Sequence, residues 1–349
     1  MADFVSKGNE SDTKKVRFRI WIMGIALIAA FFISMCIGRY AITPPDIVRI
    51  IAEHLTGATS TYDVMTTNVV MQVRLPRILL SIIIGAGLAS SGASYQCLFG
   101  NPLVSPDILG VSAGAGFGAS LAILLSAGNI SIQLVALVCG LGAVGIVLVI
   151  SRVRKKTELF MLVLSGVIVG AFFEALISFI KYIADPQNKL PAITIWLMGS
   201  LASASYRKLL IAAVTILPCI LILIVLRWKM NLLSLSEEEA TSLGVNVNRL
   251  RVVIILTATL MTAVSVSLCG IIGWIGLVIP HIGRFFIGHD HRGLIPSCVL
   301  LGGIYMLFID GIARTLTAAE LPLSILTAII GAPFFAVMLH RTMGGGKGS

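Results

Sequence analysis

Charged residues are scarce in this sequence. Asp, Glu, Lys and Arg make up 12% of the 349 residues, against roughly 25% in soluble domains. Hydrophobic residues make up 57%, and apolar stretches of about 20 residues, long enough to cross a bilayer, recur along the chain. These numbers exclude a soluble domain of any size. The sequence therefore predicts an all-α, polytopic membrane protein.

Motifs for disulfide, metal or nucleotide chemistry are also lacking. The six cysteines are scattered and form no Cys-x-x-Cys pair or Cys/His cluster, so neither a disulfide framework nor a zinc site is predicted. His289 and His291 could offer two metal ligands, but an ordinary polar turn is favoured because no third ligand is near. The C-terminal segment 344–349 lacks the spacing of a phosphate-binding loop. We therefore expect no catalytic residue, no metal site and no cofactor, and an energy source outside this chain.

Ten apolar stretches are candidate membrane spans. The first is too long for a signal-peptide core and has no persuasive cleavage site, so we expect it to be retained. The chain then divides into an N-terminal tail (1–17), one ten-helix transmembrane domain (18–340) and a C-terminal tail (341–349). The spans are 18–38, 78–98, 111–127, 132–151, 159–182, 209–227, 252–270, 272–287, 294–314 and 322–340.

The basic residues indicate the orientation of these spans. The net charge is +10, which in a soluble protein would suggest nucleic acid. Here the Lys and Arg residues lie mostly in short loops, so topology and anionic lipid explain them better. With ten spans, 17 of the 26 Lys and Arg residues fall on the side of the termini. The positive-inside rule therefore predicts that both termini are cytoplasmic, in a multi-pass protein without a nucleic-acid partner.

A polar segment at 231–251 lies between two of the spans, on the predicted cytoplasmic side. Ser234 or Ser236 could cap a short helix there, the three glutamates 237–239 suit its first turn, and Gly244 could end it in a left-handed conformation. Leu243 and Val245 would then form a small apolar spot. Such a helix could bind a soluble partner, although a plain solvated connector is the alternative for this segment taken alone.

Charged residues within the spans are costly in lipid and therefore informative. Glu174 lies in the middle of the fifth span without an obvious local partner, so it could face a water-filled pathway. Asp310 and Arg314 lie one helical turn apart and could satisfy each other. Arg74 and Arg77 begin the second span on the less basic side, where the positive-inside rule does not require them. We expect them to contact acidic residues of an extracytoplasmic protein.

The chain resembles the FecCD family of ABC-importer permeases, which serve iron-siderophores, haem and vitamin B12. No single motif is decisive, but the set runs in order over most of the chain. The matching stretches are Arg74-Leu-Pro-Arg-Ile-Leu, Gly92-Ala-Ser-Tyr-Gln-Cys-Leu-Phe-Gly-Asn-Pro-Leu, Pro106-Asp-Ile-Leu-Gly-Val-Ser-Ala-Gly-Ala, Trp196-Leu-Met-Gly-Ser, Ala240-Thr-Ser-Leu-Gly-Val, Gly276-Leu-Val-Ile-Pro-His-Ile-Gly-Arg, Asp290-His-Arg and Glu320-Leu-Pro-Leu-Ser-Ile-Leu-Thr-Ala-Ile-Ile-Gly-Ala-Pro-Phe-Phe.

The resemblance implies a BtuC-like permease of a type II ABC importer in a prokaryotic plasma (inner) membrane. Two permease copies, as a homodimer, would line the pathway above a cytoplasmic ATPase dimer, and an extracytoplasmic binding protein would deliver the substrate. It implies coupling helices at about 231–249, docking residues on the outer side, and an inner gate in the turn after the second span. The implied residues are Glu237, Glu238, Glu239, Ala240, Leu243, Gly244 and Val245 for coupling, Arg74, Arg77 and Arg314 for docking, and Asn101, Leu103, Leu159, Phe160 and Glu174 for the pathway and gate.

Two residue positions depart from the family pattern, and two other functions compete with import. Glu174 stands where a small or weakly polar residue is expected, and Leu159-Phe160 where a polar pair can occur.

An ion-coupled secondary transporter would explain Glu174 and Asp310 but not the acidic segment. A membrane enzyme using His281, His289 and His291 would lack a matched acid or nucleophile. We therefore favour the permease, with a ferric siderophore as substrate because iron chelates dominate the family.

Overall fold

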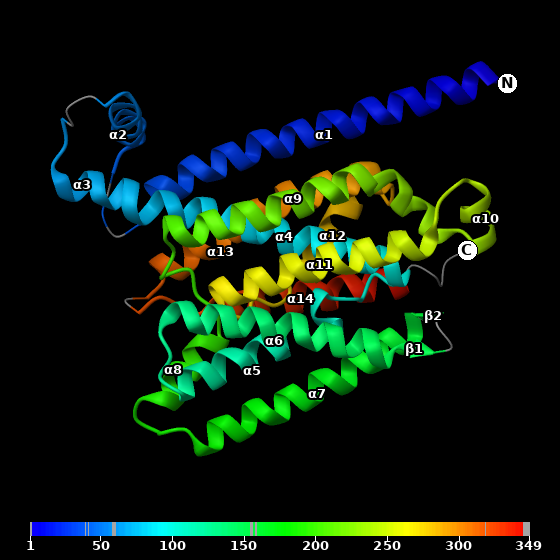
Figure 1. Cartoon of the computed structure of the whole chain (residues 1–349). Helices are drawn as coiled ribbons and strands as arrows, with labels where there is room; N and C mark the ends of the chain where they lie inside the picture. Colours follow the sequence, from blue (N-terminus) through cyan, green and yellow to red (C-terminus); the bar gives the residue numbers. More distant parts are fainter. Residues whose placement is uncertain are drawn as a thin grey trace.

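The computed structural model describes residues 2–38, 40, 42–57, 61–153, 156–157, 159–317 and 319–344, and these are almost entirely helical (Figure 1). The only strands within those ranges, β1 (Arg152–Val153) and β2 (Lys156–Thr157), form a two-residue antiparallel pair. The helices are α1 (Ala2–Cys36), α2 (Pro44–Thr56), α3 (Val64–Asn68), η1 (Val69–Arg74), α4 (Leu75–Phe99), η2 (Pro106–Leu109), α5 (Val111–Leu124), α6 (Asn129–Ile150), α7 (Leu159–Ile183), α8 (Lys189–Leu197), α9 (Tyr206–Asn231), η3 (Leu232–Ser234), α10 (Glu237–Ser242), α11 (Val247–Cys269), α12 (Ile275–Ile287), α13 (His291–Thr315) and α14 (Leu323–Gly344).

The predicted all-α fold with about ten spans is confirmed. Seven helices in the described part of the chain are long and apolar enough to cross a membrane, and three shorter apolar helices, α5, α12 and α14, complete the set. The bounds differ most at the second span, which starts at Val64 because α3 and η1 run without a break into α4. Helix α1 starts at Ala2, within the segment expected to be a tail, and its apolar portion covers Lys14–Cys36. Residues 345–349 of the expected C-terminal tail lie outside the described residues.

Helix α4 is the centre of the bundle, packed against α9, α11, α12 and α13. Its small residues let neighbouring backbones come close, as is usual between helices in lipid. A Cβ atom on Gly85 would lie 2.2 Å from the carbonyl oxygen of Gly302 on α13, and one on Gly92 would lie 1.9 Å from that of Gly276 on α12. A side chain larger than hydrogen at Gly85 or Gly92 would therefore push these helices apart.

Most of the short elements lie at the two ends of the bundle (Figure 1). At one end are α10 and the β1–β2 pair, together with the start of α1 and the end of α14. At the opposite end are α2, α3 and α8, with the break between α11 and α12, where Gly270 and Trp274 have positive φ angles of 74° and 70°. We call these the α10 end and the α8 end. The long helices run between them, as expected of a chain that crosses a membrane repeatedly.

Candidate functional site

The short helix α10 has the cap that its sequence predicts. Ser236 and Glu239 form a capping box, in which the Ser236 hydroxyl accepts from the Glu239 backbone N–H at 3.2 Å and the Glu239 carboxylate accepts from the Ser236 backbone N–H at 3.0 Å. The hydrogen bond from the Ser236 backbone lowers the pKa of Glu239 below its usual value. Gly244 follows the helix with φ at 79°, so the predicted left-handed stop is confirmed.

The surface of α10 is mostly polar, with one apolar side chain exposed at its end. The side chains of Glu237, Glu238 and Glu239 are exposed, and Leu243 is 56% exposed. Ala240 and Val245 are 1% and 6% exposed because they face inward, Val245 as part of the main hydrophobic core. The predicted apolar spot of Leu243 and Val245 is therefore wrong for Val245, and Leu243 alone provides it.

Polar contacts fix the segment around α10 to neighbouring helices. Arg251 on α11 forms an ion pair with Glu237 at 3.2 Å. The Asn231 side chain, at the end of α9, donates to the Asp290 carboxylate at 2.7 Å and accepts from the His291 backbone N–H at 2.9 Å. This Asn231 contact joins the α10 segment to the turn between α12 and α13. Beyond the polar character of each residue, no local pattern predicts this contact.

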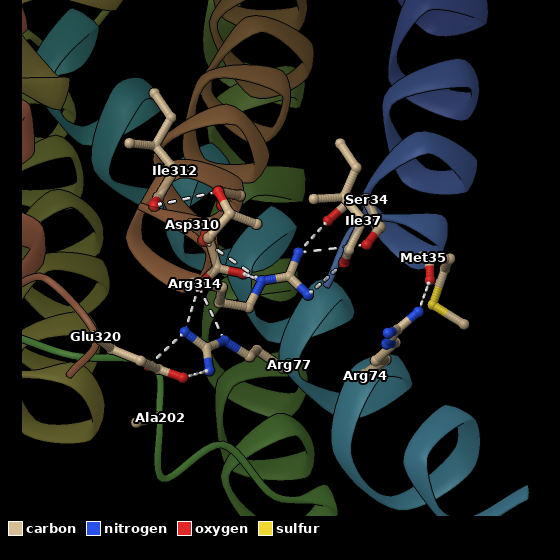
Figure 2. Close-up of polar contacts among 12 residues, drawn as sticks. Ser34, Met35, Ile37, Arg74, Arg77, Ala202, Asp310, Ile312, Arg314 and Glu320 are labelled. Carbon is tan, nitrogen blue, oxygen red and sulfur yellow. Dashed lines mark hydrogen bonds and ion pairs between the residues drawn. The ribbon is translucent and has the colours of Figure 1, made fainter. Parts of the chain in front are cut away.

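A cluster of buried charges lies at the α8 end, between α4 and α13 (Figure 2). The Arg77 guanidinium lies 2.8 Å from the Asp310 carboxylate and donates two hydrogen bonds to Glu320, at 2.8 and 2.9 Å. Arg314 forms an ion pair with Asp310 at 3.0 Å, so the expected contact one turn apart is confirmed. Glu320 was not singled out in the sequence because it lies in a loop, 243 residues from Arg77.

The arginines at this end also hold the end of α1. Arg314 donates to the Ser34 hydroxyl at 2.8 Å, and Arg74 donates to the Met35 carbonyl at 2.5 Å and to the Tyr40 carbonyl. Arg74, Arg77 and Arg314 are only 4%, 5% and 8% exposed. The guanidinium groups of Arg74 and Arg77 are thus bound to groups of their own chain, and the expected contact with acidic residues of an extracytoplasmic protein stays a prediction.

The residues expected at the gate lie at the α10 end, where α4 ends and α7 begins (Figure 1). Asn101 is exposed, and its side-chain oxygen accepts from the Leu103 backbone N–H at 2.9 Å, which forms a tight turn. Leu103 is 50% exposed and Phe160 74% exposed, while Leu159 packs partly against the core. This arrangement leaves two apolar side chains, Leu103 and Phe160, uncovered in the single chain.

Glu174 lies on an exposed face of α7. Among the described residues its carboxylate has no hydrogen-bond or ion-pair partner, and the Ser178 hydroxyl donates only to the Glu174 carbonyl, at 2.9 Å. Val167 and Tyr182, two turns away on either side, are also exposed. Glu174 is thus not packed between helices of its own chain.

No group of three or more His, Cys, Asp or Glu residues within the described ranges is arranged to hold a metal ion. The charged and polar sites are instead the α10 segment, the buried arginine cluster and the exposed face of α7.

Comparison with known proteins identifies the type of protein to which these sites belong. A model of the FecCD transport family matches residues 26–341.

The chain belongs to the FecCD transport family. Its curated relatives are permeases that differ in what their names say they carry. The molybdate import system permease MolB of Haemophilus influenzae is 42% identical over 92% of this chain and 95% of its own length. A Helicobacter pylori protein named a probable iron chelatin transport system permease is 42% identical over 79% of this chain and 83% of its own length. The vitamin B12 import permease BtuC of Klebsiella pneumoniae is 36% identical over 95% of this chain and 96% of its own length.

Solved structures agree with this FecCD assignment. A structure titled as the inward-facing conformation of a putative metal-chelate type ABC transporter matches 93% of this chain and 99% of its own, with 40% identity and a TM-score of 0.83. PsaBC of Streptococcus pneumoniae, at 16% identity and a TM-score of 0.54, shares the fold alone. This FecCD protein is therefore a multi-pass ABC transporter permease of the BtuC type. The family implies an ATPase and a substrate-binding protein as partners, and neither it nor these relatives favour the ion-coupled alternative.

Proposed function

We propose that this FecCD permease forms the translocation pathway of an ABC importer for an iron chelate. A separate ATPase dimer would drive it, and the chain itself would catalyse no reaction. The observation that carries this proposal is the capped helix α10, which offers Leu243 and its glutamates to solvent at the predicted cytoplasmic end. A secondary transporter would have no use for such a helix.

The distribution of basic residues supports a cytoplasmic α10 end. The segments at that end carry most of the Lys and Arg residues, as the positive-inside rule requires of cytoplasmic loops. Both chain ends and α10 then lie in the cytoplasm of a prokaryotic cell, and α2, α3 and α8 lie outside. An ATPase can reach α10 only in this orientation.

We propose that Leu243 is the apolar anchor of the ATPase contact and that Glu237 and Glu238 form its charged rim. Glu239 and Gly244 shape the helix through the capping box and the left-handed stop. Ala240 and Val245 are buried and therefore fix α10 to the bundle rather than touching the partner. An exposed apolar residue within a polar surface is typical of an interface anchor.

For the buried arginines we propose a positioning role at the outer surface. Arg74, Arg77 and Arg314 join the ends of α1, α4 and α13 and the loop that carries Glu320. A binding protein would then dock on a surface that these residues hold in shape. Docking of the binding protein would then depend indirectly on the three arginines, because their loss would free the end of α1 and the loop that carries Glu320.

The pathway is proposed to lie between two copies of this chain, against the exposed face of α7. Glu174 would face this pathway, and its isolation from basic residues of its own chain supports a wet environment. Asn101 and Leu103, with Leu159 and Phe160, would form the inner gate. The uncovered side chains of Leu103 and Phe160 support this role, since a second copy or a closed gate would cover them.

A ferric siderophore is the favoured substrate, and the iron chelatin permease of Helicobacter pylori supports it. Molybdate is a second candidate, because MolB shares 42% identity over nearly its full length. The test is uptake into proteoliposomes that contain the permease, its ATPase and its binding protein. ATP-dependent uptake of a radiolabelled ferric siderophore, competed by excess of the same chelate but not by molybdate, is expected. Uptake that is independent of ATP would refute the importer, and ATP-dependent uptake of molybdate alone would refute only the iron chelate.

A further inference from the structure

A cavity of about 850 Å³ is lined by α8, the starts of α6 and α9, and the ends of α5 and α11. These parts of the chain lie toward the α8 end of the bundle (Figure 1). Its volume lies within the range of about 300–1,000 Å³ that is usual for small-molecule sites. Three basic residues line it, Lys189, Arg207 and Lys208, and no Asp or Glu is among its lining residues. The lining is therefore strongly positive without an internal counter-charge.

The two lysines are held in place by neutral oxygens only. The Lys208 ammonium donates to the Ser203 hydroxyl at 2.7 Å and to the Leu268 carbonyl at 2.8 Å. The Lys189 ammonium donates to the Ile123 carbonyl at 3.1 Å and to the Ser126 hydroxyl. An ammonium group has three donors, so each lysine keeps one N–H for a ligand. Both side chains are thus fixed in position while their charges stay uncompensated.

Arg207 adds a third charge at the mouth of the cavity. Its side chain is exposed, and it has no hydrogen bond or ion pair with any residue in the described ranges. The nearest acidic residue along the chain from Lys189 is Asp185, whose carboxylate already accepts from the backbone N–H groups of Gln187 and Asn188. Helix α9 begins at the cavity, and its N-terminus adds further positive potential.

The cavity continues into apolar surface on both sides. On α9, Leu210 and Val214 follow Arg207 on the same helical face and are 63% and 65% exposed. On α6, Ile130 and Leu134 are exposed in the same way, one turn apart. Basic groups at the end of a bundle, followed by exposed apolar side chains one and two turns deeper, match the headgroup and acyl chains of a lipid.

We propose that this cavity binds a phosphate group and that the phosphate belongs to an anionic phospholipid of the adjoining leaflet. The phosphate lies between Lys189, Arg207 and Lys208, with hydroxyl groups such as that of Ser203 beside it. The acyl chains run along the exposed faces of α6 and α9. The bound lipid would fix α8 and the starts of α6 and α9 relative to one another.

The test uses the full-length permease purified in a nonionic detergent. Phosphatidylglycerol, phosphatidylcholine of the same chain length and inorganic phosphate are each titrated, and the midpoint of thermal unfolding gives an apparent affinity. Arg207→Gln removes one charge without removing an internal contact, and Ala192→Trp fills the cavity from the exposed side of α8 without a change of charge. Lys181→Gln, at the same end on α7 but outside the cavity lining, is the matched control.

Phosphatidylglycerol is expected to stabilise the wild type, and phosphatidylcholine to have little effect at equal concentration. Loss of one basic contact should weaken the affinity for phosphatidylglycerol about fivefold. Arg207→Gln should show this loss, and Ala192→Trp should also weaken the affinity because it fills the cavity. Arg207→Lys should restore the affinity, and Lys181→Gln should match the wild type. If all variants bind phosphatidylglycerol with equal affinity, the lipid is attracted by the basic residues of the whole surface and not by this cavity, and the proposal fails. Stabilisation by inorganic phosphate alone, lost in Arg207→Gln and not seen with lipid, would overturn the lipid source.

Discussion

Removal of Arg77 should destabilise the protein more than removal of any exposed charge. The cluster of Arg77, Arg314, Asp310 and Glu320 is neutral as it stands, with two positive and two negative groups. Arg77→Met leaves one net negative charge around Asp310, whose side chain is fully buried. Loss of one partner from a buried ion pair costs about 3–5 kcal/mol. We expect a loss of unfolding free energy in that range.

Glu320→Gln is the matched comparison within the same cluster. The Glu320 side chain is 33% exposed, so water can compensate the positive charge that remains, and the amide can still accept from Arg77. A partly exposed ion pair contributes at most about 1 kcal/mol. Most of the cost of Arg77→Met should therefore arise from Asp310, which keeps only Arg314 as an ion-pair partner, and a smaller part from the charge left on Glu320.

The double variant Arg77→Met/Glu320→Gln separates charge balance from packing. It restores a neutral cluster of Asp310 and Arg314, so its cost should be lower than the sum of the single costs, by about 1–2 kcal/mol. The measurement is unfolding of the purified protein in mixed detergent micelles, followed by tryptophan fluorescence. If Arg77→Met costs no more than Glu320→Gln, or if the two costs add without coupling, the electrostatic account of this cluster is refuted.

Three further predictions concern the proposed transport sites. Leu243→Asp should abolish ATP-driven uptake while insertion into the membrane stays normal, because a charge replaces the exposed anchor; normal uptake by a well-expressed variant would contradict the assignment of α10. Ser236→Ala should weaken the cap of α10 by about 1 kcal/mol and reduce ATPase binding in a pull-down, whereas Ser234→Ala should not. The pKa of Glu239 is lowered in the folded chain, so the stability from this cap is fully present above the unfolded pKa of about 4.3. It is lost as the pH falls below that value through the lower folded pKa, and ATPase binding should fall over the same range. Glu174→Gln should leave folding and assembly unchanged but alter the pH dependence or selectivity of uptake; identical pH profiles would count against the pathway role.

Much of the fold could be predicted because the lipid bilayer imposes a simple rule on the sequence of each spanning segment. A spanning segment must be apolar over about 20 residues, so the spans follow from hydropathy, and even the short α12 between Gly270 and Gly288 was expected. The cap of α10 was predictable for a related reason. Its residues Ser236 and Glu239 lie three positions apart, and a local motif depends only on local spacing.

Burial of the arginines could not be predicted in the same way. Whether Arg77 faces solvent depends on Asp310 and Glu320, which are 233 and 243 residues away. Nothing in the local pattern around Arg77 reports those partners. The same holds for Val245, which is buried in the main hydrophobic core although its neighbours in the sequence are exposed or polar. Sequence reasoning thus identified the polar residues at each end but not the direction in which they point.

The two ends of the bundle are held by different kinds of interaction, and this difference bears on which end moves in transport. At the α8 end, buried ion pairs link Arg77 on α4 to Asp310 on α13, and Arg314 donates a hydrogen bond to Ser34 on α1. Separating the ion pairs would leave charges unpaired in a place with little water. At the α10 end, the contacts of Glu237 and Asn231 are exposed to solvent, so water can replace them at small cost. Local opening should therefore be easier at the α10 end. In the proposed transporter, the ATPase would bind at the α10 end and drive its conformational change. The end that must open first is therefore also the end with the weaker contacts.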